Sequence, residues 1–213
     1  MSHTFEEARR WQQGGTVVLL AALDRLMVED YDEPAGVPGW SRKHLLAHVA
    51  ANADALQNLV TWARTGMETP MYTSAEARSE AIEKGSRLAA DKLAAWVRQS
   101  ADALETAMAA LTDEQWETKV VTVQGRTVPA AATPWMRSRE VFVHAVDLAN
   151  GTTFADLPED FLLALQEDIK NKRGVVPEVL GTVADVAAWL AGRPYANLTQ
   201  TDGSPTPVLG PWL

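Results

Sequence analysis

Helical spacing of apolar residues over the first two-thirds of the chain constrains the fold more than any other feature. Val17, Leu20 and Leu23 belong to one such pattern, and a wider apolar stripe follows Ser41, a good helix N-cap. The predicted helices cover residues 5–28, 41–65, 75–110 with a break at Gly85 and Ser86, and 134–150. Because the last segment is apolar on several faces, we expect that helix to be central. Four long helices predict a mainly α fold, a helix bundle with sites in its core.

The rest of the chain predicts smaller elements. Residues 119–128 are typical of a β-hairpin, with Gln124 and Gly125 in a two-residue primed turn. Beyond Gly151 we predict helices over 158–172 and 182–192, followed by an extended, proline-rich tail. These boundaries divide the chain into a helix bundle, residues 1–152, and a C-terminal helical region, residues 153–213.

Charge and composition exclude several classes of function. The chain has 19 Lys and Arg against 28 Asp and Glu, and the net charge of -9 argues against nucleic acid or an anionic membrane as a partner. The absence of cysteine excludes disulfides, a cysteine nucleophile and thiol chemistry supplied by this chain. We see no signal-peptide pattern and no apolar run near the ~20 residues that span a bilayer. We therefore expect a cytoplasmic protein, and the sequence leaves its oligomeric state open.

Three polar residues on predicted apolar helices are candidate metal ligands. Glu140 and His144 are four residues apart on the predicted central helix, so a carboxylate and an imidazole share one face. Adding His48 gives a His/Glu/His set with an open coordination position, the pattern of a catalytic zinc site. A competing ligand set combines His44, His48 and Glu140. The alternative to any metal site is that Glu140 and His144 form a hydrogen-bonded pair on one helix face. Asn52, one turn beyond His48, is either a residue that orients a ligand or a helix-surface polar residue.

Several longer segments resemble the mycothiol-dependent maleylpyruvate isomerase family. The similar segments within residues 5–165 are Gly39–Ala50, Asn58–Tyr72, Gln124–Pro129 and Trp135–Leu148. Two C-terminal segments, Trp189–Arg193 and Gly210–Leu213, are similar as well. The resemblance implies a DinB-like four-helix bundle that binds a divalent metal, usually zinc. The family's ligands match His48, Glu140 and His144.

The resemblance also implies a reaction and further site residues. Mycothiol would supply the thiol that the chain lacks, and the substrate would be a small acid, maleylpyruvate, an intermediate of gentisate catabolism. Addition of the thiol to the cis double bond, rotation and elimination would give fumarylpyruvate. Arg193 matches a catalytic, substrate-binding arginine of the family, and a guanidinium is well suited to binding a carboxylate. The alternative interpretation of Arg193 is a positive charge that complements the dipole at the end of a helix. Arg78 matches a position that would also bind substrate.

One departure from the family pattern keeps other functions open. Only residues 174–181 separate the two C-terminal helices, which leaves no room for the family's usual C-terminal sheet and predicts a shortened C-terminal region. That favours, as a second hypothesis, a mycothiol S-transferase or another thiol-dependent enzyme acting on a different electrophile. A third is a metal-binding bundle without catalysis. Nickel, cobalt or iron would also suit the ligand set.

Overall fold

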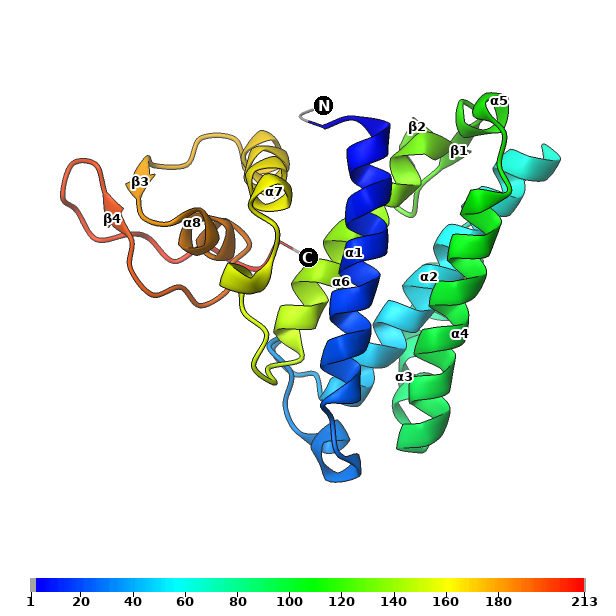
Figure 1. Cartoon of the computed structure of the whole chain (residues 1–213), viewed down its shortest axis with the longest axis horizontal. Helices are drawn as coiled ribbons and strands as arrows, with labels where there is room; N and C mark the ends of the chain where they lie inside the picture. Colours follow the sequence, from blue (N-terminus) through cyan, green and yellow to red (C-terminus); the bar gives the residue numbers. More distant parts are fainter. Residues whose placement is uncertain (1–2, 213) are drawn as a thin grey trace. The chain divides into compact units, whose positions relative to one another are not determined.

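The computed structural model describes residues 3–212 (Figure 1). Backbone contacts divide the described residues into two units, one spanning Phe5–Asn150 and the other made of residues 151–212 with His3 and Thr4. Both are built mainly from helices, so the mainly α fold predicted from the sequence is confirmed.

Four long helices dominate the first unit. Its elements are α1 (Phe5–Asp24), η1 (Val28–Asp32), α2 (Arg42–Thr65), α3 (Ala75–Ser86), α4 (Ala90–Ala109), α5 (Asp113–Trp116), β1 (Lys119–Val121), β2 (Thr127–Pro129), η2 (Ala130–Ala132) and α6 (Thr133–Asp147). Figure 1 shows α1 beside α6 and α2 beside α4, and these pairs have the most extensive packing. Helix α2 also packs against α6, which places the two helices that carry the candidate ligands side by side.

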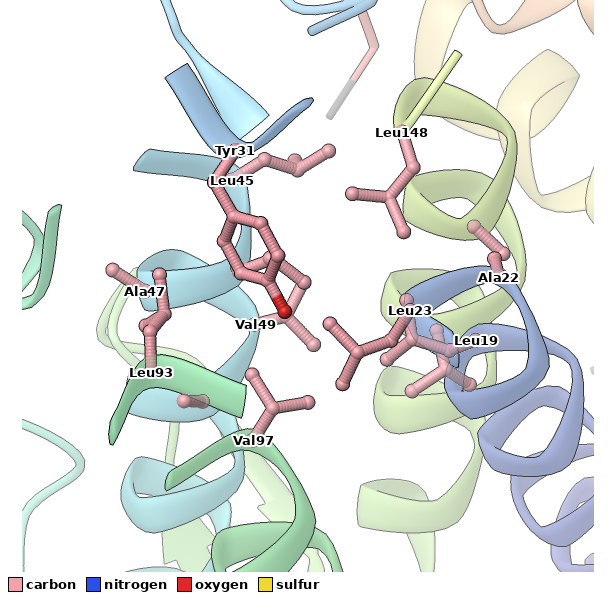
Figure 2. Close-up of a cluster of buried hydrophobic side chains, with 14 residues drawn as sticks. Leu19, Ala22, Leu23, Tyr31, Leu45, Ala47, Val49, Leu93, Val97 and Leu148 are labelled. Carbon is pink, nitrogen blue, oxygen red and sulfur yellow. The ribbon is translucent and has the colours of Figure 1, made fainter. Parts of the chain in front are cut away.

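The core of this unit lies where the four long helices meet. Figure 2 shows one buried cluster, to which Leu23 of α1, Val49 of α2 and Val97 of α4 contribute. A second cluster lies further along the bundle, where Leu56 of α2 and Leu104 of α4 are fully buried. Each such leucine or valine contributes about 1.5–3 kcal/mol when it leaves water. This packing fixes α2 within the bundle, and with it the position of the ligands.

A glycine permits the close approach of α1 and α6. A Cβ added to Gly15 would lie 2.5 Å from Val141 Cγ2 and 3.0 Å from Phe142 Cδ2. Neighbouring Gly14 has only an ordinary contact, 3.9 Å from Phe142 Cζ. The absence of a side chain at position 15 therefore sets how closely α1 packs on the helix that carries Glu140 and His144.

The predicted helix boundaries are confirmed at both ends of α2 and differ elsewhere. Ser41 Oγ accepts a hydrogen bond from His44 N, and Gly66 ends the helix with a left-handed φ of 73°. The first helix ends at Asp24, not at residue 28, because Met27 and Val28 are exposed and begin a 3-10 turn instead of extending the apolar face.

The β1–β2 hairpin is confirmed, but the predicted primed turn is wrong. Thr122 N donates to Arg126 O at 2.9 Å, and Gly125 N donates to Thr122 O at 2.8 Å. A two-residue type I′ turn needs positive φ at both central residues, whereas Gly125 has a φ of 74° and Gln124 does not share it. The loop is therefore a three-residue turn that closes on a left-handed glycine.

The second unit contains a helix pair and a short strand pair. Its elements are η3 (Phe154–Asp156), α7 (Glu159–Arg173), β3 (Val179–Leu180), α8 (Val183–Leu190) and β4 (Thr199–Gln200). Helix α7 packs on α8, and β3 pairs with β4 in antiparallel register. Trp189 of α8 is buried, and its Nε1 donates to Pro207 O at 2.7 Å, which ties the proline-rich tail to this unit. Over residues 3–212, none of the helices is both long and apolar enough to cross a membrane.

Candidate metal centre

The structure brings together His48, Glu140 and His144, the first of the two candidate ligand sets. His48 lies in the buried part of α2, and Glu140 and His144 lie one turn apart on α6. Glu140 Oε2 is 3.0 Å from His48 Nε2 and 3.2 Å from His144 Nε2. One ligand atom from each side chain lies within 4.8 Å of the other two. Between residues 3 and 212, no other group of three His, Asp or Glu side chains has this arrangement.

An arginine at the start of α2 fixes that helix to the end of α6. Arg42 Nε donates to Leu148 O at 2.7 Å, and its Nη2 donates to Ala149 O at 2.9 Å. Carbonyls at a helix C-terminus have no donor within the helix, so a cationic side chain suits them well. Ala149 has a left-handed φ of 52°, a strained conformation for a residue with a Cβ. These contacts set the register between the helix that carries His48 and the helix that carries the other two ligands.

Asp147 orients the imidazole of His144, a role the sequence analysis missed. Its Oδ2 lies 2.9 Å from His144 Nδ1, and both side chains are buried. With the proton on Nδ1 held by the carboxylate, Nε2 is left to face Glu140 and His48. Metal-binding histidines commonly have such a carboxylate on the second nitrogen. The signal was present in the sequence as an Asp three residues after His144 on the same helix face.

The protonation of the cluster follows from burial and from its hydrogen bonds. Burial lowers the pKa of His144, but hydrogen bonds to Asp147 and Glu140 outweigh it and raise that pKa to about 9. Burial raises the pKa of Glu140, but hydrogen bonds from His144 and His48 hold it well below its usual value. Burial dominates at His48 and lowers its pKa. Without metal, the cluster therefore holds a carboxylate between a charged and a neutral imidazole at neutral pH.

The competing ligand set, with His44 in place of His144, is not brought together. His44 Nδ1 lies 2.8 Å from Ser41 Oγ, within the N-terminal cap of α2, and its Nε2 is 3.8 Å from Glu83. The interpretation of Asn52 as a helix-surface residue is wrong. Asn52 is buried, and its Oδ1 accepts a hydrogen bond from Arg137 Nη1 at 2.8 Å.

Aromatic and cationic side chains surround His48. Arg78 of α3 places its Nη2 3.4 Å from His48 Nδ1. The ring centroid of Trp40 is 5.4 Å from that of His48. Tyr72, in the loop before α3, is half-buried, and the nearby Arg78 charge partly offsets the rise that burial causes in its pKa. Arg78 thus lies beside His48, and its role toward substrate stays a prediction. No role was predicted for Trp40 or Tyr72.

Arg193 belongs to the second unit, where it follows α8. Its side chain is buried, and Nη1 donates to Ala191 O at 2.7 Å. Its role toward substrate stays a prediction.

The donor chemistry of the centre fits a divalent ion such as zinc. It offers two imidazole nitrogens and one carboxylate oxygen, and one of the imidazoles is oriented by Asp147. Three protein ligands leave a coordination position open for a thiol, a water molecule or a substrate. The fold and the site together define a helix-bundle protein with a three-residue candidate metal site.

Comparison with known proteins assigns the family. The model of the mycothiol maleylpyruvate isomerase N-terminal domain matches residues 14–149. A crystal structure of the mycothiol-dependent maleylpyruvate isomerase matches with a TM-score of 0.91 and 37% identity, over 99% of this chain and 98% of that chain. A crystal structure of a histidine-to-alanine mutant of that isomerase matches with 36% identity, the same TM-score and the same coverage. Comparison with curated proteins gives no match. The chain belongs to the mycothiol-dependent maleylpyruvate isomerase family.

The C-terminal region contains a strand pair that was not predicted. The match covers 98% of the solved isomerase chain, and the shortened C-terminal region stays a prediction. The segment between α7 and α8 carries strand β3, which pairs with β4 from the tail. This strand pair could not be predicted, because each strand has only two residues, too few to show an alternation of apolar and polar side chains.

Proposed function

We propose that this chain is a zinc- and mycothiol-dependent cis–trans isomerase that converts maleylpyruvate to fumarylpyruvate. The observation that carries the proposal is the convergence of His48, Glu140 and His144 in a bundle that matches the solved isomerase over nearly its whole length. The absence of cysteine from the chain supports a thiol that comes from outside.

The roles of the chain's own residues follow from the geometry of the centre. His48, Glu140 and His144 would hold the ion through two nitrogens and one oxygen. A zinc ion held there would lower the pKa of a bound thiol, and the chemistry it would supply is a thiolate able to add reversibly to the cis double bond, so that rotation and elimination can follow. Asp147 keeps the proton of His144 on Nδ1. The burial of both imidazoles limits access of water to the centre.

Two arginines are proposed to bind the carboxylates of the substrate. The contact of Arg78 with His48 supports a position at the edge of the centre. The support for Arg193, as a catalytic and substrate-binding residue, is its match to the family arginine and the bidentate fit of a guanidinium to a carboxylate. We expect Arg78→Ala and Arg193→Ala to raise KM for the substrate while the zinc content stays unchanged. The exposed Arg98, paired with Asp24, provides a control substitution, Arg98→Ala.

Loss of maleylpyruvate on the zinc-loaded full chain tests the proposal. The reaction is followed with mycothiol, without thiol, and with glutathione instead. We expect turnover only with mycothiol. The His48→Ala variant should lose zinc and turnover together, whereas His44→Ala, one turn earlier on the same helix, should keep both.

The other hypotheses are outcomes of the same experiment. Zinc bound at the centre without turnover of maleylpyruvate would refute the isomerase and point to a mycothiol S-transferase or to a bundle without catalysis. Reaction of mycothiol with other electrophiles would separate those two.

A further inference from the structure

Arg137 is a buried charge that the proposed chemistry does not use. It lies on α6 and is fully buried. Its Nη1 donates to Val49 O and to Asn52 Oδ1, both at 2.8 Å. These acceptors lie on α2, one and four residues after the ligand His48. Both acceptors are neutral. Burial of a guanidinium is costly, so a buried arginine without a carboxylate partner needs a specific reason.

The charge of Arg137 is not cancelled by a direct ion pair. No carboxylate among residues 3–212 lies within salt-bridge distance of its guanidinium, and Nη2 finds no hydrogen-bond partner there. Burial lowers its pKa to about 10, and Glu140 is the negative charge that acts on it most strongly. The side chain therefore stays charged at neutral pH. Glu140 is three residues further along α6, so the two side chains lie on the same side of that helix.

The balance of charges at the centre shows what Arg137 would do. A divalent ion brings two positive charges, and the carboxylates of Glu140 and Asp147 together cancel them, because both histidines are neutral when they bind metal. Arg78 adds a positive charge but is half-exposed and therefore screened. Arg137 is shielded from water, so its charge is screened less than that of Arg78. Asp54, the second carboxylate that acts on Arg137, is exposed and therefore screened. Arg137 thus leaves the loaded centre with a net positive charge.

We propose that Arg137 supplies the permanent positive charge that makes the metal centre prefer anionic ligands, such as a thiolate, over neutral ones. This inference rests on the metal site of the proposed function, but not on the identity of the substrate. Arg137 is a positioning residue in this role: it acts on the ligand through its charge, not through contact. A residue that only joined α2 to α6 would affect neutral and anionic ligands alike.

Ligand titrations of the cobalt(II)-loaded full chain test the proposal. Visible absorption would report the binding of thiocyanate, an anion, and of imidazole, a neutral ligand, at saturating cobalt and constant ionic strength. We expect Arg137→Gln and Arg137→Met to weaken thiocyanate binding about 10-fold, or about 1.4 kcal/mol, and to change imidazole binding less than about 3-fold. Arg137→Lys keeps the charge and should bind thiocyanate nearly as the unmodified protein does. Arg9→Met is the matched control, since Arg9 joins α1 to α4 through Glu105 and Met108.

Several results would overturn the proposal. Equal weakening of both ligands would mean that Arg137 acts through geometry, and unchanged thiocyanate binding would remove its charge from the site. A lysine variant that behaves like the neutral variants, or failure of both neutral variants to fold, would assign Arg137 to the packing of the core. Failure of the unmodified protein to bind cobalt at His48 would overturn it as well. Normal ligand selectivity without turnover of maleylpyruvate would instead contradict only the proposed isomerase.

Discussion

Replacement of Asp147 by asparagine tests how the centre holds its metal. Asp147 Oδ2 accepts the Nδ1 proton of His144 at 2.9 Å, and the side chains of both residues are buried. Asparagine has the same shape and can still accept a hydrogen bond, but it lacks the charge that makes the bond strong. Removal of such a partner typically costs a metal site 10–100-fold in affinity, which is about 1.4–2.7 kcal/mol.

The same carboxylate also favours a proton on His144, so the size of the effect depends on pH. With a pKa of about 9, His144 is protonated in the metal-free protein at neutral pH, and a metal must displace that proton. Two pH units below that pKa, this competition weakens apparent binding by about 100-fold. Asp147→Asn lowers the pKa of His144 and relieves part of the competition. The loss of affinity should therefore be largest above pH 9 and smaller near pH 7.

Competition with a chromophoric zinc chelator between pH 7 and 9.5 measures both effects. The unmodified protein should gain apparent affinity by about tenfold per pH unit up to about pH 9, where its proton is lost. Asp24→Asn, at an exposed carboxylate paired with Arg98, is the control and should not change zinc binding. A folded Asp147→Asn variant that binds zinc as tightly as the unmodified protein at pH 9.5 would refute the reasoning.

Three further predictions concern stability. The pKa of His144 is higher in the folded protein than the value near 6.5 expected in the unfolded chain, so protonation of His144 stabilises the metal-free fold, fully so below pH 6.5. The Tm of the metal-free protein should therefore fall as pH rises from 6.5 through about 9. A Tm that rises over this range would contradict the prediction. Gly15→Ala should destabilise the protein by about 1–3 kcal/mol, because the new Cβ would clash with Val141. Gly14→Ala should stabilise it by about 0.5–1 kcal/mol, because alanine favours a helix and has room at that position. Urea unfolding of the two variants measures the difference, and equal effects would refute the packing argument. Ser41→Ala should cost about 1 kcal/mol through loss of the α2 cap, and chemical denaturation that shows no change would rule the cap out.

Local patterns made much of the fold predictable. Helix α2 begins and ends where its cap residues Ser41 and Gly66 predict, because capping depends on residues only a few positions apart. The errors lie where distant packing decides. Met27 and Val28 continue an apolar pattern but find no core to pack on, so α1 ends earlier.

The sequence by itself determined the helices, the spacing of Glu140 and His144 on one helix face, and the absence of a thiol, because these depend on local spacing or on composition. Only the tertiary structure decided that His144, and not His44, joins His48 and Glu140 in the ligand set. His44 and His48 lie one turn apart on α2, so which of them faces α6 depends on how the two helices pack. The same packing buries Arg137 against α2 and leaves its charge without a carboxylate partner among the described residues. Sequence spacing along one helix carries no information about the register of another helix against it.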